Sequence, residues 1–236
     1  VVGVNGNMIT IEVFGDVLMN EIGYVVVNTS EGVKKLKAEV IRIKGKYADL
    51  QVFESTNGLK VGDEVEFTGE MLSAMLGPGL LGQVYDGLQN PLSELAEEAG
   101  KISVDAGYFL QRGMYLPGLP RERKWDFHPT AKPGDRVAAG DHIGWGTEGI
   151  FDNKIMPGHK IMVPFALKGV YRVKSIAEAG DYTVTEKIAE LESESGGEPV
   201  SVTMMQRWPV KVPIKCFAER LAPTETLETS VRTIDT

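Results

Sequence analysis

Short β-forming runs separated by glycine turns fill the first part of the chain, and they constrain its fold most strongly. The runs MITIEVF (8–14), YVVVNT (24–29) and VGDEVEFTG (61–69) are rich in β-branched and aromatic residues. Between them, KAEVIRIKGKYADLQVF (37–53) alternates apolar and charged residues around a Lys-Gly turn. Several short strands joined by close turns predict a small closed barrel over residues 1–68 rather than an open sheet.

A second β-rich region is expected over residues 101–190. Its runs KPGDRVAAGDHIGWGTE (132–148) and MVPFALKGVYRVKSIAEAGDYTV (162–184) contain Gly-Asp pairs like the one in the first region. Such pairs favour turns because glycine tolerates positive φ and aspartate bonds its own downstream amides. No fixed period separates these turns, which argues against a repeat protein. We therefore expect a second barrel-like body, and a mainly β chain.

A stretch between the two β-rich regions, LGPGLLGQVYDGLQNPL (76–92), indicates a rigid bend. Gly77 and Gly79 allow backbone angles that other residues avoid, while Pro78 fixes one angle and removes a donor. The tripeptide is expected to join two bodies of the fold. Just after it, PLSELAEEAG (91–100) has apolar residues at helical spacing and predicts a short helix.

Composition limits the classes of partner and compartment. With 236 residues, of which 42% are hydrophobic and 25% charged, the chain can bury a sizeable core. A net charge of −8 argues against nonspecific nucleic-acid binding and, more weakly, against docking to anionic lipid. Cys216 is the only cysteine, which excludes an intrachain disulfide and favours a reducing cytoplasm. No apolar run is long enough for a membrane span, and no signal-peptide pattern opens the chain.

The residue types that carry common chemistry form no catalytic or metal-binding motif. His128, His142 and His159 lack metal-ligand spacing and are expected to be structural or surface residues. Cys216 lies between apolar residues, where burial as a small hydrophobe is expected rather than a nucleophilic role. Lys168 lacks the exposed hairpin context of a biotinyl or lipoyl acceptor. No catalytic residue and no metal ligand is therefore predicted.

A phosphate-binding loop is also missing from the sequence. The pattern GxxxxGK[ST] does not occur, and GPGLLG (77–82) has glycines but no lysine. A phosphate cradle needs convergent N–H groups and a lysine for the outer phosphates. These 236 residues are thus expected to hold no nucleotide-binding or cofactor-binding residue.

One segment combines basic and aromatic residues. RGMYLPGLPRERKWDFHP (112–129) contains Arg121, Arg123 and Trp125. Such patches sometimes bind nucleic acid. In an acidic protein they are more typical of a surface for another protein, where Trp and Arg are frequent anchors.

The order of four segments carries a family resemblance. TGEMLSAMLGPGLLGQVYDGLQNPL, RGMYLPGLPRERKWDFHP, GDYTV and VTMMQRWPVKVP follow one another along the chain. Together they resemble the N-terminal part of the catalytic A (alpha) subunit of V-type and archaeal-type rotary ATPases. The resemblance covers essentially the whole chain, and LGPGLLGQVYDGLQNPL and MMQRWPVKVP are its most specific pieces.

The resemblance implies a domain organisation. Residues 1–68 would form the N-terminal β-barrel of a crown, and residues 69–100 a connector with the first piece of an α/β nucleotide-binding domain. Residues 101–190 would be the bulge insertion that marks the A subunit. Residues 191–236 would re-enter the nucleotide-binding domain, which is incomplete because the P-loop would follow Thr236.

The resemblance also implies a function for the parent protein. It would be an ion-translocating ATPase or ATP synthase that couples ATP hydrolysis or synthesis to proton or sodium transport, with ATP and Mg in the parent only. Its partners would be the B subunits of an alternating ring and the peripheral and central stalks. This portion would serve ring assembly and stalk contact in the cytoplasm, peripheral to the membrane and without inserting into it. The structural or interaction residues expected here are Gly77, Pro78, Gly79, Arg121, Arg123, Trp125 and Trp208.

A free-standing, non-catalytic β-barrel interaction module is the alternative. A self-contained module should end in a capped or polar tail, whereas a severed one leaves apolar surface unmet. The last stretch, VPIKCFAERLAPTETLETSVRTIDT, resembles a severed end and thus favours the portion of a rotary ATPase A subunit over the free-standing module.

Overall fold

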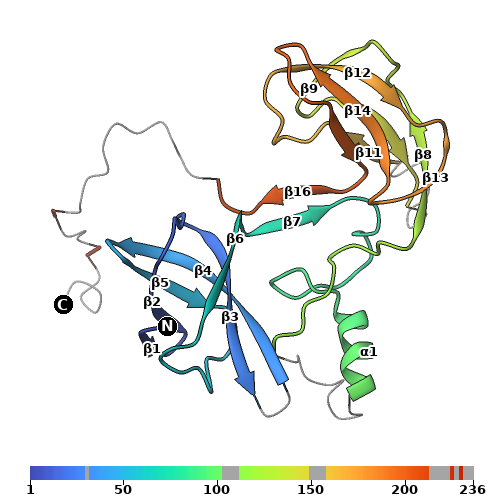
Figure 1. The fold of residues 1–236 in the computed structure, drawn as a ribbon. Coiled ribbons are helices and arrows are strands. Elements are labelled where there is room, and N and C mark those ends of the chain that lie inside the picture. The colour runs from blue at the N-terminus through green and yellow to red at the C-terminus, as the bar shows by residue number, and fades with distance from the viewer. Residues whose placement is uncertain (30–31, 103–111, 149–157, 213–223, 226–228, 231–236) are drawn as a thin grey trace.

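The chain folds into two β-rich bodies that a two-stranded ribbon connects (Figure 1). The computed structural model describes residues 1–29, 32–102, 112–148, 158–212, 224–225 and 229–230. Mainly β structure is confirmed by the succession of short strands along these residues. None of the helices in these ranges is long and apolar enough to cross a membrane.

The first body is a six-stranded antiparallel sheet with the strand order β1-β2-β5-β4-β3-β6. Its strands are β1 (Gly3–Asn5), β2 (Met8–Glu12), β3 (Glu21–Thr29), β4 (Gly32–Lys44), β5 (Tyr47–Val52) and β6 (Val65–Met71). Lys44 pairs with Tyr47 across the β4–β5 turn, where Gly45 has φ of +57°. The turn thus lies where the Lys-Gly pair predicts it. Alternate residues such as Ile9, Val25 and Leu50 are fully buried and form one core.

The closed barrel expected over residues 1–68 is not found among the described strands. The edge strands β1 and β6 share no ladder in the described part of the chain. Instead, Val1 connects the two edges: its ammonium donates to the Asp63 carbonyl at 2.6 Å, and its carbonyl accepts from Gly62 N–H at 2.8 Å. Because β1 is only three residues long, it offers too few main-chain groups to extend this contact into a ladder.

The second body consists of two four-stranded sheets over one apolar core. The first sheet has the order β11 (His159–Met162), β10 (His142–Gly146), β8 (Lys124–Pro129) and β13 (Gly180–Thr183). The second has the order β15 (Val200–Thr203), β14 (Lys187–Ser193), β12 (Val170–Ile176) and β9 (Arg136–Ala138). Phe127 and Ile143 from one sheet join Val173 and Leu191 from the other in a single buried cluster. The body is therefore a sandwich of facing sheets, and β14 runs across the expected domain boundary at residue 190.

A ribbon and one helix complete the described structure; the strand β7 and the helix lie between the two bodies in the sequence, and the strand β16 follows the second body. The ribbon pairs β7 (Ser73–Leu76) with β16 (Gln206–Pro209), and Figure 1 places it between the two bodies. The helix α1 (Leu92–Ile102) confirms the short helix expected after Pro91. It buries Leu95 and Ala99, four residues apart on one face.

Candidate interaction site at the junction of the two bodies

The ribbon pairs strands from two of the four segments that carry the family resemblance, TGEMLSAMLGPGLLGQVYDGLQNPL and VTMMQRWPVKVP. Arg207 lies opposite Met75, and Trp208 lies opposite Ala74. The N–H of Val210 donates to the Leu72 carbonyl at 2.8 Å and extends the pairing by one bond. Two segments about 130 residues apart in the sequence are thus neighbours at the junction of the two bodies.

The Gly77-Pro78-Gly79 bend is buried and packs against the second body. A Cβ at Gly77 would lie 3.0 Å from the Met204 carbonyl oxygen, closer than ordinary packing allows. Gly79 has φ of +104°, and a Cβ there would lie 3.0 Å from both Pro120 and Trp125. Position 79 therefore requires glycine, because other residues avoid this backbone angle and because a side chain would have no space.

A buried carboxylate holds this bend in place. Glu148 is 8% exposed, and its Oε1 accepts a 2.7 Å hydrogen bond from Gly79 N–H. The Nδ1 atom of His159 lies 3.7 Å from the same oxygen. Burial lowers the pKa of His159, and the nearby charge of Glu148 opposes that shift. No local pattern in the sequence pointed to Glu148, because its partner is 69 residues away.

Trp125 and its neighbouring arginines do not form one exposed patch. Trp125 is only 4% exposed and belongs to the core of the second body. The guanidinium of Arg123 lies 4.0 Å from the centre of its ring, in a cation–π contact. Arg121 is exposed and lines a pocket, whereas Arg112 donates to the Asn57 carbonyl of the first body at 2.6 Å. Arg112, Arg121 and Arg123 thus contact different parts of the molecule and do not gather in one basic surface patch.

Trp208 on the ribbon forms an exposed aromatic pair with Phe165, which lies between β11 and β12 of the second body. Its ring meets Phe165 edge-to-face, with 4.7 Å between the ring centres. Trp208 is 37% exposed and Phe165 is 54% exposed. Partly exposed aromatic pairs of this kind are frequent anchors of protein interfaces.

Two ion pairs tie β16 and the residues just after it to the first body. Arg207 pairs with Glu70 at the end of β6, and Lys211 Nζ lies 2.6 Å from Glu39 Oε1. Glu39 is only 4% exposed, so the ammonium of Lys211 is needed to compensate the charge of its buried carboxylate. No sequence pattern pointed to these pairs, because each joins residues more than 130 positions apart.

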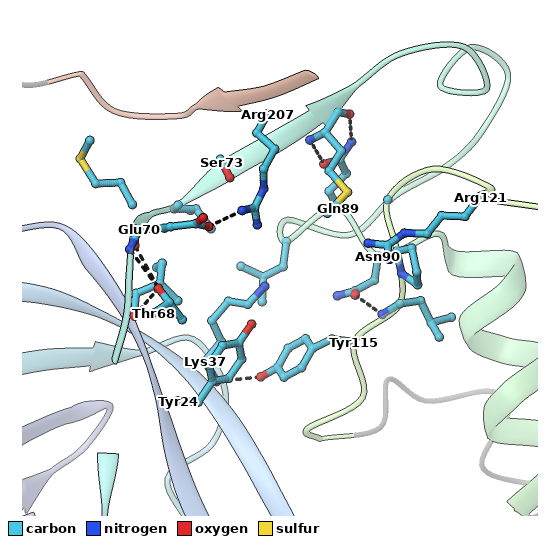
Figure 2. Close-up of a pocket in the computed structure, with 18 residues that line it drawn as sticks. Tyr24, Lys37, Thr68, Glu70, Ser73, Gln89, Asn90, Tyr115, Arg121 and Arg207 are labelled. Atoms are coloured by element: carbon cyan, nitrogen blue, oxygen red, sulfur yellow. Dashed lines mark hydrogen bonds and ion pairs between the residues drawn. The ribbon is translucent and has the colours of Figure 1, made fainter. Parts of the chain in front are cut away.

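A polar pocket of about 290 Å³ opens at this junction (Figure 2). It is lined by strands of the first body, by the connector, by residues 115–118 with Arg121, and by β16. Three cationic side chains contribute to its wall: Lys37 on β4, Arg121, and Arg207 on β16. Arg121 is one of the interaction residues expected from the sequence, whereas no sequence pattern pointed to Lys37 or Arg207.

The side chains of Gln89 and Asn90 hold the wall of the pocket by hydrogen bonds to main-chain groups. Gln89 accepts from Met75 N–H at 2.7 Å and donates to the Met75 carbonyl at 2.6 Å, as a neighbouring strand would. The buried Asn90 accepts from Leu116 N–H at 2.9 Å and donates to Asp86 at 2.8 Å. The connector and the segment that leads to Arg121 are thus fixed to each other.

Tyr115 joins this wall to the first body. Its hydroxyl accepts from the main-chain N–H of Lys37 at 2.8 Å, and its ring meets Tyr24 edge-to-face with 6.0 Å between centres. Burial raises the pKa of the Tyr115 phenol well above its ordinary value. The phenol therefore stays protonated and acts as a neutral hydrogen-bonding group.

The three histidines lie on the neighbouring strands β8, β10 and β11 but have different surroundings. His128 stacks on Trp145 with 4.3 Å between ring centres, and its Nε2 lies 3.2 Å from Asp126. His142 is exposed at the start of β10. Within the described ranges, no three His, Cys, Asp or Glu side chains gather as metal ligands. Cys216 lies outside the described residues.

Two family models match the chain, one for each β body. The ATP synthase alpha/beta family, beta-barrel domain matches residues 1–69. The ATPsynthase alpha/beta subunit barrel-sandwich domain matches residues 116–211, which include both sheets of the second body and β16.

Relatives align with the chain from end to end. It is 56% identical over 236 residues to a V-type ATP synthase alpha chain of Treponema denticola, and 51% identical over 236 residues to one of Borrelia turicatae. It is 52% identical over 233 residues, 99% of the chain, to V-type ATP synthase alpha chain 1 of Treponema pallidum. The chain spans 37%, 38% and 36% of the length of these three relatives, respectively. The chain therefore belongs to the ATP synthase alpha/beta family.

Proposed function

We propose that this chain is the N-terminal portion of the catalytic alpha (A) subunit of a V-type rotary ATPase. The parent protein would couple ATP hydrolysis or synthesis to proton or sodium transport, with ATP and Mg bound elsewhere in the parent. The observation that carries this proposal is 56% identity over all 236 residues to a V-type ATP synthase alpha chain. The complex would place the chain in the cytoplasm, peripheral to the membrane.

The role of this portion would be assembly rather than chemistry. The pattern GxxxxGK[ST] does not occur in its 236 residues, so tight ATP binding needs a phosphate loop elsewhere in the parent. The first body supports contact with neighbouring subunits. Its open edge carries a groove of about 590 Å³ that includes Val2 and Phe14, and Phe14 is 94% exposed. Exposed apolar side chains of this size are typical of subunit interfaces.

The neighbours would be the B (beta) subunits of an alternating ring, with the second body directed towards the peripheral stalk. The exposed pair of Trp208 on the ribbon and Phe165 on the second body supports a further contact, with the nucleotide-binding domain of the parent or with a stalk subunit. The buried Gly77-Pro78-Gly79 bend would then transmit the position of the second body to the ribbon without flexing.

Ring assembly of the parent protein tests this proposal. We would co-express the full-length protein that contains this chain with the beta chain of its complex, and measure ring size by light scattering and ATP hydrolysis by phosphate release. A ring that hydrolyses ATP is expected. Phe14→Ser should weaken ring assembly, whereas Val33→Ser should not, because Val33 is also exposed (63%) but lies outside the groove.

The absence of any complex with the beta chain would contradict the proposal and favour a free-standing interaction module. Equal effects of Phe14→Ser and Val33→Ser would contradict only the assigned groove.

A further inference from the structure

We propose that the polar pocket at the junction binds a small phosphate-like oxyanion on Lys37, Arg121 and Arg207. Its volume of about 290 Å³ lies at the lower end of the range for small-ligand sites. This inference goes beyond the proposed function, which assigns no ligand to this part of the chain.

The charge of the lining favours an anion. Lys37, Arg121 and Arg207 come from three separate segments, and Glu70 is the one carboxylate among the described lining residues. This gathering of cations stands out in a chain whose net charge is −8. Figure 2 shows Lys37 and Arg207 directed into the same hollow from opposite sides. A bound anion would lie between them and lower their mutual repulsion.

These cations retain hydrogen-bonding capacity for a ligand. Arg207 pairs with Glu70, but a guanidinium has five N–H donors, so part of its fork remains available. In the part of the chain that the structure describes, neither Lys37 nor Arg121 forms an ion pair. The ammonium of Lys37 instead lies 4.8 Å from the centre of the Tyr115 ring. A cation held against an aromatic face is weakly neutralised there and still attracts an anion.

Two nearby carboxylates already have other donors. Glu54 accepts from Gly113 N–H at 2.8 Å. Asp86 accepts from the main-chain and side-chain N–H groups of Asn90 at 2.7 and 2.8 Å. Burial lowers the pKa of Lys37, and the charges of Asp86 and Glu54 oppose this shift without supplying a hydrogen bond to its ammonium. An anion in the pocket would compensate the charge of the half-buried Lys37 ammonium directly.

The arrangement suits a tetrahedral oxyanion better than a planar carboxylate. Guanidinium forks match the oxygens of phosphate with two parallel hydrogen bonds. Cations on different sides of one hollow engage several oxygens at once, and phosphate offers four. The hydroxyls of Tyr24 and Ser73 also line the pocket and add neutral donors.

The test measures inorganic phosphate binding to the 236-residue chain by calorimetry, with chloride keeping the ionic strength constant. Lys37→Gln and Arg121→Gln each remove one charged donor and should weaken binding about tenfold or more. Lys60→Gln, at an exposed site outside the pocket, should leave binding unchanged. Arg121 is itself exposed, so its variant keeps the test valid if Lys37→Gln unfolds the chain.

A second arm with adenosine monophosphate distinguishes the source of the phosphate group. Tighter binding of the nucleotide than of phosphate would indicate an organic phosphate, and equal or weaker binding would indicate the free ion. Both results support the site if the pocket variants weaken binding and Lys60→Gln does not. Equal binding in all variants, or no binding up to about 10 mM of either probe, would overturn the proposal.

Discussion

Replacing Gly79 with alanine tests whether the bend is fixed by its packing against the second body. Two costs are expected to add. A side chain at φ of +104° carries roughly 1–2 kcal/mol of backbone strain. The new Cβ would also lie 3.0 Å from Pro120 and from Trp125, and overpacking of this kind costs roughly 1–3 kcal/mol. Gly79→Ala should therefore lower the free energy of unfolding by about 2–5 kcal/mol.

A matched variant separates the two costs. Gly134 has φ of +96°, but a Cβ there would meet no atom within 4 Å. Gly134→Ala should thus cost only the strain of about 1–2 kcal/mol. Urea unfolding, followed by circular dichroism and by tryptophan fluorescence, gives both values, and unchanged slopes would show that the same amount of surface unfolds. Equal losses in the two variants would refute the packing argument.

Three further predictions concern charged groups at or near the junction. Lys211→Ala should cost roughly 1–3 kcal/mol of unfolding free energy in urea, because it leaves the buried Glu39 carboxylate unpaired while Lys211 itself is half exposed. Glu148→Ala should cost about 1–3 kcal/mol by leaving Gly79 N–H without its acceptor, and Glu148→Gln should restore most of the loss in the same assay. Because burial holds the pKa of His159 below 6.5 in the folded chain, the unfolded chain binds the proton first, and stability should fall as pH drops below about 6.5. His159→Gln should flatten this part of the stability–pH curve, and an unchanged curve would contradict the assignment.

Local patterns predicted local structure well. The Lys-Gly turn between β4 and β5 and the helix α1 after Pro91 both depend on residues close together in the sequence. The mainly β character also followed from short alternating runs with glycine turns. In each case, the preference of a few adjacent residues agrees with the packing around them.

Closure of the first body could not be predicted in this way. It depends on whether the edges β1 and β6 present enough main-chain groups to each other. The strand pattern of residues 1–68 is the same for a closed barrel and for a curved sheet. In the structure, β1 is only three residues long, and Val1 joins the two edges by two main-chain hydrogen bonds without a ladder between β1 and β6.

The junction was the part of the molecule least visible in the sequence. The sequence marked Trp125 as an exposed anchor because of its basic neighbours, yet the Gly77-Pro78-Gly79 bend and the second core cover it. The pairing of β7 with β16 and the contact of Glu39 with Lys211 join residues far apart along the chain. Such contacts depend on the whole fold, and a single sequence carries no local trace of them.

Reading the gene beyond the codon for Thr236 tests the proposed function most directly. The account predicts an open reading frame that continues into a strand, a GxxxxGK[ST] loop and a helix, which together supply the phosphate-binding site of a catalytic alpha subunit. A natural stop codon at that position, with no phosphate loop to follow, would contradict the account.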